Sequence, residues 1–159
     1  MISSKSRIDI FAAALGDRKP VPGGGASAAL TGAIGAALIM KVANFTIGRK
    51  KYRMYEKDAK AIFLKAQRLE TKLAAYIEKD ARSYEQYSRT RSASSMKKAT
   101  LCVEEIAALS KEALKYCPRL RKIGNRNLAG DLRAAELFLK ASAGAAENLA
   151  RLNKKWTGR

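Results

Sequence analysis

The stretch PVPGGGASAALTGAIGAALIMKVANFT, residues 20–46, has three consecutive glycines, many small side chains and no charge before Lys41. The 159-residue chain as a whole carries 32 Lys and Arg against 14 Asp and Glu, a formal charge of +18. Because proline disfavours helix at the residue before it and glycine permits unusual backbone angles, the first residues predict a loop. The alanines and glycines that follow let neighbouring backbones approach closely. We expect a tightly packed helix from about 25 to 46.

On either side of this stretch the sequence shows helical periodicity and no strand-like alternation. The remaining helices are predicted at about 5–16, 53–89, 96–116 and 128–154. The basic segments between them, 47–58 and 119–127, are expected to be a break and a turn. The prediction is an all-α, single-domain bundle of about five helices over residues 1–159, a length suited to one core.

The central helix contributes little burial of its own, because its side chains are small. Close neighbours must therefore surround it, and a second subunit can supply some of them, so we expect a homodimer formed by helix packing. Residues 21–40 are uncharged and long enough to raise the question of a membrane span, yet five are glycine and six are alanine. This composition is weakly hydrophobic for lipid, and a buried helix with no membrane association is the prediction.

The absence of histidine excludes a Ser-His-Asp triad, a Cys-His pair and a histidine metal ligand. Proton transfer must then use Asp, Glu, Lys, Tyr, Cys or water. Cys102 and Cys117 are predicted in one helix, about 22 Å apart, which is beyond disulfide reach. Two reduced thiols that serve as packing residues, and an N-terminus without an apolar signal core, indicate a cytoplasmic protein.

Two groups of residues are candidates for a binding site. Gly23–Gly25 at a helix start can present backbone N–H groups to an anion, or can simply permit a tight turn and close contact. Tyr76, Asp80, Tyr84 and Tyr87 follow a spacing of four, four and three, so they share one helix face. A carboxylate among aromatic rings suits a flat, cationic or polar ligand, while the alternative is a helix edge where the tyrosines cover the core and Asp80 is solvated.

Other polar residues have sufficient structural roles. Asn127 is a plausible N-cap, Asp131 is a first-turn carboxylate favoured by the helix dipole, and Asn44 can be a satisfied core amide. Basic clusters with an aromatic residue nearby occur at 48–53, 89–91, 119–122 and 153–156. They can bind single-stranded nucleic acid, form a solvated surface, or steer an anionic substrate.

Taken together, these segments resemble the cyclodeaminase/cyclohydrolase family, the all-helical formiminotetrahydrofolate cyclodeaminases and methenyltetrahydrofolate cyclohydrolases. The resemblance begins over residues 11–52, with Pro-x-Pro-Gly-Gly-Gly at the entry to the small-residue helix and Asn-x-Thr-x-Gly-x-Lys-Lys-Tyr at its exit. It continues with EKDARSY at 78–84 and ends with GNRNLAGDLRAAELFLKASAGAAENLARLN at 124–153. It covers nearly the whole chain.

The resemblance implies a dimer whose triple-glycine turn shapes a folate pocket, with Asp80 as the catalytic carboxylate. The substrate-binding residues that it implies are Pro22, Gly23, Gly24, Gly25, Asn44, Lys50, Lys51, Tyr84, Asn125 and Asp131. Among these, Asp131 holds the pterin, Tyr84 stacks or donates a hydrogen bond, and the lysines receive a glutamate or polyglutamate tail. The implied chemistry needs no metal and no cofactor besides the tetrahydrofolate substrate.

The expected function is hydrolysis of 5,10-methenyltetrahydrofolate to 10-formyltetrahydrofolate, or deamination of 5-formiminotetrahydrofolate to the methenyl compound. The sequence departs from the family pattern at Ala26, where serine is common, and at Val103, where proline is common. The connection between Tyr87 and Cys102 is also short. The alternatives are a folate-binding paralogue without turnover, and a non-enzymatic basic module that binds nucleic acid or an acidic partner.

Overall fold

The structure of the chain, a computed structural model, describes residue 3 and residues 5–157. Its α-helices are α1 (Ile8–Leu15), α2 (Gly24–Asn44), α3 (Glu56–Thr90), α4 (Ala93–Leu114), α5 (Cys117–Ile123) and α6 (Ala129–Thr157). Two 3-10 helices, η1 (Lys50–Tyr55) and η2 (Arg126–Leu128), lie in the connections. The described residues contain no strand, and the all-α prediction is confirmed.

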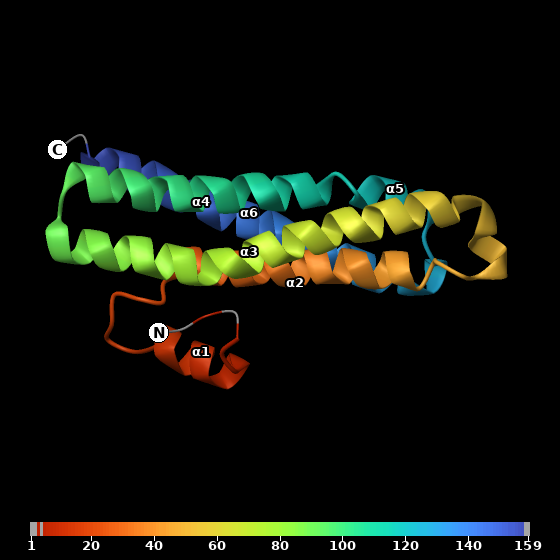
Figure 1. Ribbon diagram of the computed structural model, residues 1–159, viewed down its shortest axis with the longest axis horizontal. Helices are drawn as coiled ribbons and strands as arrows, with labels where there is room; N and C mark the ends of the chain where they lie inside the picture. The colour runs from red at the N-terminus through yellow and green to blue at the C-terminus, as the bar shows by residue number, and fades with distance from the viewer. Residues whose placement is uncertain (1–2, 4, 158–159) are drawn as a thin grey trace.

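Four long helices form an elongated bundle, in which α2 packs against α3 and α6, and α4 packs against the same two helices (Figure 1). The short α1 lies outside this bundle, below it in the view of Figure 1. Since α2 begins beside Asp80, ten residues before α3 ends, α3 extends about 15 Å beyond the start of α2. At that end the place of a fourth helix is taken by the loop that leads into Gly24.

The small residues of α2 permit the close helix contacts that the sequence predicts. A Cβ atom built on Gly32 would lie 2.8 Å from the hydroxyl oxygens of both Ser110 and Ser142, which are hydrogen-bonded to each other at 2.8 Å. A Cβ atom on Gly35 would lie 2.7 Å from Cγ of Leu139. These contacts put α2 against α4 and α6 at distances that a larger side chain would prevent.

The prediction of a turn over 119–127 is wrong in its first half, because Cys117–Ile123 is helix α5. Pro118 lies in the first turn of this helix, where the missing N–H costs nothing, so it begins the helix instead of blocking it. Cys102 and Cys117 consequently belong to two different helices, contrary to the prediction of one. Both thiols are free and buried.

The short connection noted after Tyr87 is a tight turn between α3 and α4. Arg91 takes a left-handed conformation, with φ of 51°. Ser92 then caps α4, its hydroxyl accepting a hydrogen bond from the backbone N–H of Ser95. The two long helices therefore reverse direction within two residues, and α4 begins at Ala93 instead of near residue 96.

By length and composition alone, α2 is apolar enough to cross a membrane. This is weak evidence, since core helices pass the same test, and 56% of its apolar window is buried within the bundle. Its contacts with α3 and α6 explain its composition without a bilayer.

Candidate functional site

The side chain of Asp80 lies buried against the first turn of α2, with a relative exposure of 6%. A Cβ atom built on Gly25 would lie 2.2 Å from Oδ1 of Asp80, so only glycine leaves room for the carboxylate. The backbone N–H of Ala26 donates a hydrogen bond to it. The first turn of a helix has unpaired N–H groups and the positive end of the helix dipole, so it is a favourable place for an anion.

Burial nevertheless raises the pKa of Asp80 to about 6, because removing a carboxylate from water penalises its charged form. The hydrogen bond from Ala26 acts in the opposite direction and is the smaller effect. Among the residues that the structure describes, no lysine or arginine lines the cavity in front of the carboxylate. The Asp80 carboxylate therefore has backbone stabilisation but no cationic side chain in this cavity, and its pKa lies near neutral pH, as suits a group that accepts a proton or stabilises a cation.

The cavity that Asp80 faces has a volume of about 220 Å³ and lies where α3, α4 and α6 extend past the start of α2. Its walls are mainly apolar, with the side chains of Tyr84 and Trp156 as aromatic surfaces. Binding sites for drug-sized ligands usually enclose about 300–1,000 Å³. This cavity accordingly has room for one ring system of a larger ligand, whose remainder must extend outside it.

Five of the predicted site residues are brought together here. They are Gly23, Gly24, Gly25, Asp80 and Tyr84. Pro22 is buried in the same loop, but Pro20 and Val21 form the wall in its place. The predicted face of four side chains on α3 divides, because only Asp80 and Tyr84 of the four line the cavity. Tyr76 instead accepts a hydrogen bond from Lys79 at 3.2 Å, and Tyr87 packs against Tyr84.

The other five predicted residues lie at the opposite end of α2. They are Asn44, Lys50, Lys51, Asn125 and Asp131. Since α2 has 21 residues, its ends are about 30 Å apart. Asp131 forms an ion pair with Lys41 at 2.6 Å, and the amide of Asn125 donates to the carbonyl oxygen of Phe45 at 3.2 Å. Within one subunit these residues are therefore separated from Asp80.

The contribution of α6 to the cavity is not among the sequence predictions. Leu149, Leu152, Asn153 and Trp156 all line it, and Asn153 is 8% exposed. Their spacing of three, one and three places them on one helix face. In the sequence, the signal for this face is an amide, Asn153, at helical spacing from leucines and a tryptophan. The basic residues at 154 and 155 interrupt this pattern, so the sequence of the segment predicts a charged cluster instead.

The two cysteines are unsuited to nucleophilic chemistry. Burial raises the pKa of the Cys102 thiol, and it raises that of Cys117 to about 11. A protonated thiol is a far weaker nucleophile than a thiolate. Both cysteines are therefore packing groups at neutral pH.

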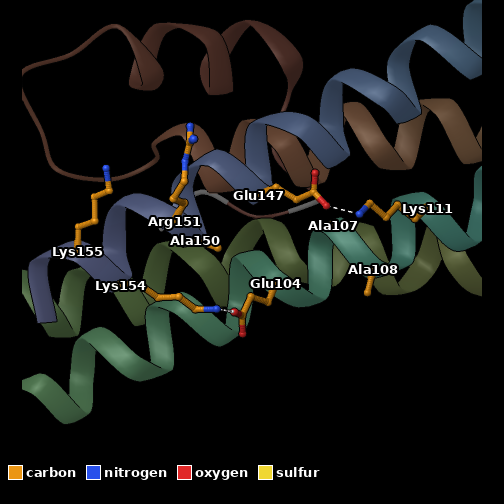
Figure 2. A pocket seen from close by; sticks show the side chains of 9 residues that line it. All are labelled: Glu104, Ala107, Ala108, Lys111, Glu147, Ala150, Arg151, Lys154 and Lys155. Carbon is orange, nitrogen blue, oxygen red and sulfur yellow. Dashed lines mark ion pairs between the residues drawn. The ribbon is translucent and has the colours of Figure 1, made fainter. Parts of the chain in front are cut away.

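A larger hollow of about 770 Å³ lies between α4 and α6 (Figure 2). Its floor is made of alanines, and Figure 2 shows two ion pairs across it, Lys111 with Glu147 and Lys154 with Glu104. Both carboxylates are at least one-third exposed, and each has a cationic partner. Size alone therefore does not make this the candidate site, since no charge in it is buried and uncompensated.

The sequence profile of the formiminotransferase-cyclodeaminase family matches residues 7–155. A methenyltetrahydrofolate cyclohydrolase of Methylorubrum extorquens is 38% identical over 84 residues, 53% of this chain and 40% of that protein. A formimidoyltransferase-cyclodeaminase of Sus scrofa is 32% identical over 77 residues, 48% of this chain and 14% of that protein. The matched segments thus span less than half of either curated relative.

A solved structure, the formiminotetrahydrofolate cyclodeaminase of Thermotoga maritima, superimposes with a TM-score of 0.91 and 26% sequence identity. The match covers 95% of this chain and 79% of that one. The bundle described above is therefore shared over almost its full length with that structure. Because the family profile spans nearly the whole sequence, the chain belongs to the formiminotransferase-cyclodeaminase family.

Proposed function

We propose that the chain is a folate one-carbon enzyme. It hydrolyses 5,10-methenyltetrahydrofolate to 10-formyltetrahydrofolate, or deaminates 5-formiminotetrahydrofolate to the methenyl compound. The observation that carries the proposal is the Asp80 carboxylate, buried against Gly25 in an apolar cavity that no lysine or arginine of the described ranges lines. Family membership and relatives named for both reactions support it.

The chemistry of the bridged folate matches this site. In the methenyl compound the N5–C–N10 bridge is a delocalised cation, which a facing carboxylate stabilises. Asp80 takes a proton from the water that attacks the bridge carbon and returns it to N5 as the N5–C bond breaks. The remaining hydroxyl proton leaves to solvent, and the formyl group stays on N10. In the deamination, N10 attacks the formimino carbon and its proton passes to the imino nitrogen. A second proton, from protonated Asp80 or from solvent, lets that nitrogen leave as ammonia, which forms the same cation. Neither reaction needs a metal or a redox cofactor.

The test of catalysis is the loss of methenyl absorbance above the uncatalysed rate, in the wild type and in Asp80→Asn. We expect Asp80→Asn to lower the rate by at least about 100-fold, the usual contribution of a general base. Because burial raises the pKa of Asp80 to about 6, the wild-type rate should fall as the pH drops below that value. Equal rates for the two proteins contradict the assignment. Release of ammonia from the formimino substrate distinguishes the second reaction from the first.

We further propose a cytoplasmic homodimer in which Lys50 and Lys51 serve the site of the partner. No charged residue occurs in α2 before Lys41, and Ile34 is 42% exposed on its outer surface. For two chains of charge +18, an uncharged face is the place where they repel each other least. Antiparallel pairing through it brings η1 of one copy toward the glycine turn of the other, where the lysines can bind the glutamate tail of the substrate.

A further inference from the structure

A second cavity, of about 360 Å³, lies at the end of the bundle formed by α5, η2 and the start of α6. It shares no lining residue with the cavity of Asp80. Three arginines line it, Arg121, Arg126 and Arg133, together with apolar side chains that include Leu120 and Leu128. A cavity of this kind combines a cationic rim with an apolar surface.

Two of these arginines are oriented by one buried carboxylate. Glu136 is only 8% exposed, and it forms ion pairs with Arg121 from α5 and with Arg133 from its own helix. A guanidinium has five N–H donors in a fixed plane, so a pair with one carboxylate leaves donors for another oxyanion. One negative charge thus holds two positive ones in place, and the cavity keeps an excess of positive charge.

The third arginine has no such partner. Across residues 3 and 5–157, no ion pair or hydrogen bond involves the guanidinium of Arg126. Its backbone is held firmly, because its N–H donates to the hydroxyl of Tyr52 at 3.2 Å. The turn before it is equally constrained, since Asn125 donates its backbone N–H to Thr46 Oγ1 at 2.9 Å. A free guanidinium on a fixed backbone is suited to binding an anion with little ordering cost.

Close packing also forms this turn. A Cβ atom on Gly124 would lie 2.5 Å from the carbonyl oxygen of Leu120 and 3.2 Å from a methyl group of Val42. The turn therefore sits directly on α5 and α2, which keeps the three arginines around one space. The catalytic proposal above uses none of the three.

We propose that this cavity binds an organic oxyanion, a phosphate or carboxylate attached to a compact apolar body. The three arginines bind the oxyanion by charge-assisted hydrogen bonds, and the leucine surface covers the apolar part. This is an additional ligand site, about 30 Å along α2 from Asp80 in the same subunit. Asn125, one of the predicted substrate residues, also lines this cavity, so the proposal is tested with ligands other than folate, which separates it from the folate chemistry.

The test is isothermal titration of the full chain with phenyl phosphate, benzoate and inorganic phosphate. We expect saturable binding of one phenyl phosphate per chain in the millimolar range or tighter, with inorganic phosphate weaker. Benzoate distinguishes the two head groups, because a carboxylate site binds it at least as tightly as phenyl phosphate. Absence of saturable binding for both aromatic anions overturns the proposal.

Variants locate the binding. Arg126→Ala should weaken phenyl phosphate by about tenfold, while Arg89→Ala, an exposed arginine on α3, should leave it unchanged. Leu128→Ala should weaken phenyl phosphate but not inorganic phosphate. An equal loss in the two arginine variants shows attraction by net charge alone and contradicts a defined site. The same affinity is expected in Asp80→Asn, so failure of the folate proposal and failure of this one are distinguishable.

Discussion

At the scale of single residues, the contact between Asp80 and Gly25 combines two opposing effects. The N-terminus of α2 favours an anion, but burial disfavours charge, and burial is the larger effect on the pKa of Asp80. A glycine is required where the carboxylate touches the backbone. The candidate active site therefore holds a group whose ionised form lowers the stability of the fold, as is common where function determines the residue.

Asp80→Asn should stabilise the fold at pH 8. The pKa of Asp80 is about 6 when folded and near 3.8 when unfolded, so its contribution to stability is greatest below pH 3.8 and is lost as the pH rises through 6. Asparagine avoids this loss, which is worth at most about 3 kcal/mol. Urea unfolding at pH 8 should show a gain of about 1–3 kcal/mol that shrinks toward pH 4. A less stable variant at pH 8 contradicts the burial argument, and Glu112→Gln, at an exposed site on α4, is the control.

Gly25→Ala should reduce activity more than Gly23→Ala. At Gly25 the added carbon overlaps the Asp80 carboxylate, which must move, whereas at Gly23 it meets only the carbonyl oxygen of Pro20 at 3.7 Å. Gly23 has extended backbone angles that alanine adopts readily. We expect a loss of kcat/KM of tenfold or more, about 1.4 kcal/mol, for the first variant alone. Similar kinetics for both variants would show that the fit around Asp80 is not needed.

At the scale of elements, close packing against the neighbouring helices determines which residues α2 can contain. It contains the residues with the poorest helix propensity after proline, since Gly32 and Gly35 lie in its interior. The hydroxyl of Ser142 also donates to the carbonyl oxygen of Ala28 at 2.7 Å, which links α6 to the backbone of α2. Close packing and this buried hydrogen bond offset the low propensity.

Gly32→Ala should therefore destabilise the bundle although alanine is the better helix former. The new methyl group meets the hydroxyl oxygens of Ser110 and Ser142 at 2.8 Å, and overpacking of this kind costs about 1–3 kcal/mol. Gly144→Ala is the matched control, because nothing lies within 4 Å of the added carbon on α6. That variant should gain about 0.5–1 kcal/mol. If chemical denaturation shows that both substitutions change the free energy of unfolding in the same direction, the close contact at Gly32 does not determine stability.

At the scale of the whole molecule, one subunit separates the two groups of predicted site residues. Asp80 and the glycine turn are at one end of α2, and Lys50 and Lys51 are at the other. The cavity at Asp80 is also too small for the entire folate of the proposed reaction, and within residues 3 and 5–157 no lysine or arginine lines it to bind the carboxylates of that substrate. Both features are consistent with a site completed by a second copy.

Mixing two inactive variants tests the shared site. In a dimer of Asp80→Asn with the double variant Lys50→Ala and Lys51→Ala, one of the two shared sites has only native residues. An equal mixture, exchanged and assayed with a polyglutamylated substrate below saturation, should regain about one-quarter of wild-type activity. Activity no greater than the mean of the separate variants contradicts a shared site. Light scattering that gives a monomer excludes it directly.

The sequence by itself determined the helical class, the central small-residue helix and the common face of Asp80 and Tyr84, because these depend on local spacing along the chain. Only the tertiary structure decided that Asn153 and Trp156 line the same cavity as Asp80, since they are some 70 residues from it in the sequence. It also decided that Asn125 and Asp131 lie at the far end of α2. Contacts between distant segments depend on how the helices pack against one another, and periodicity within one helix carries no information about its neighbour.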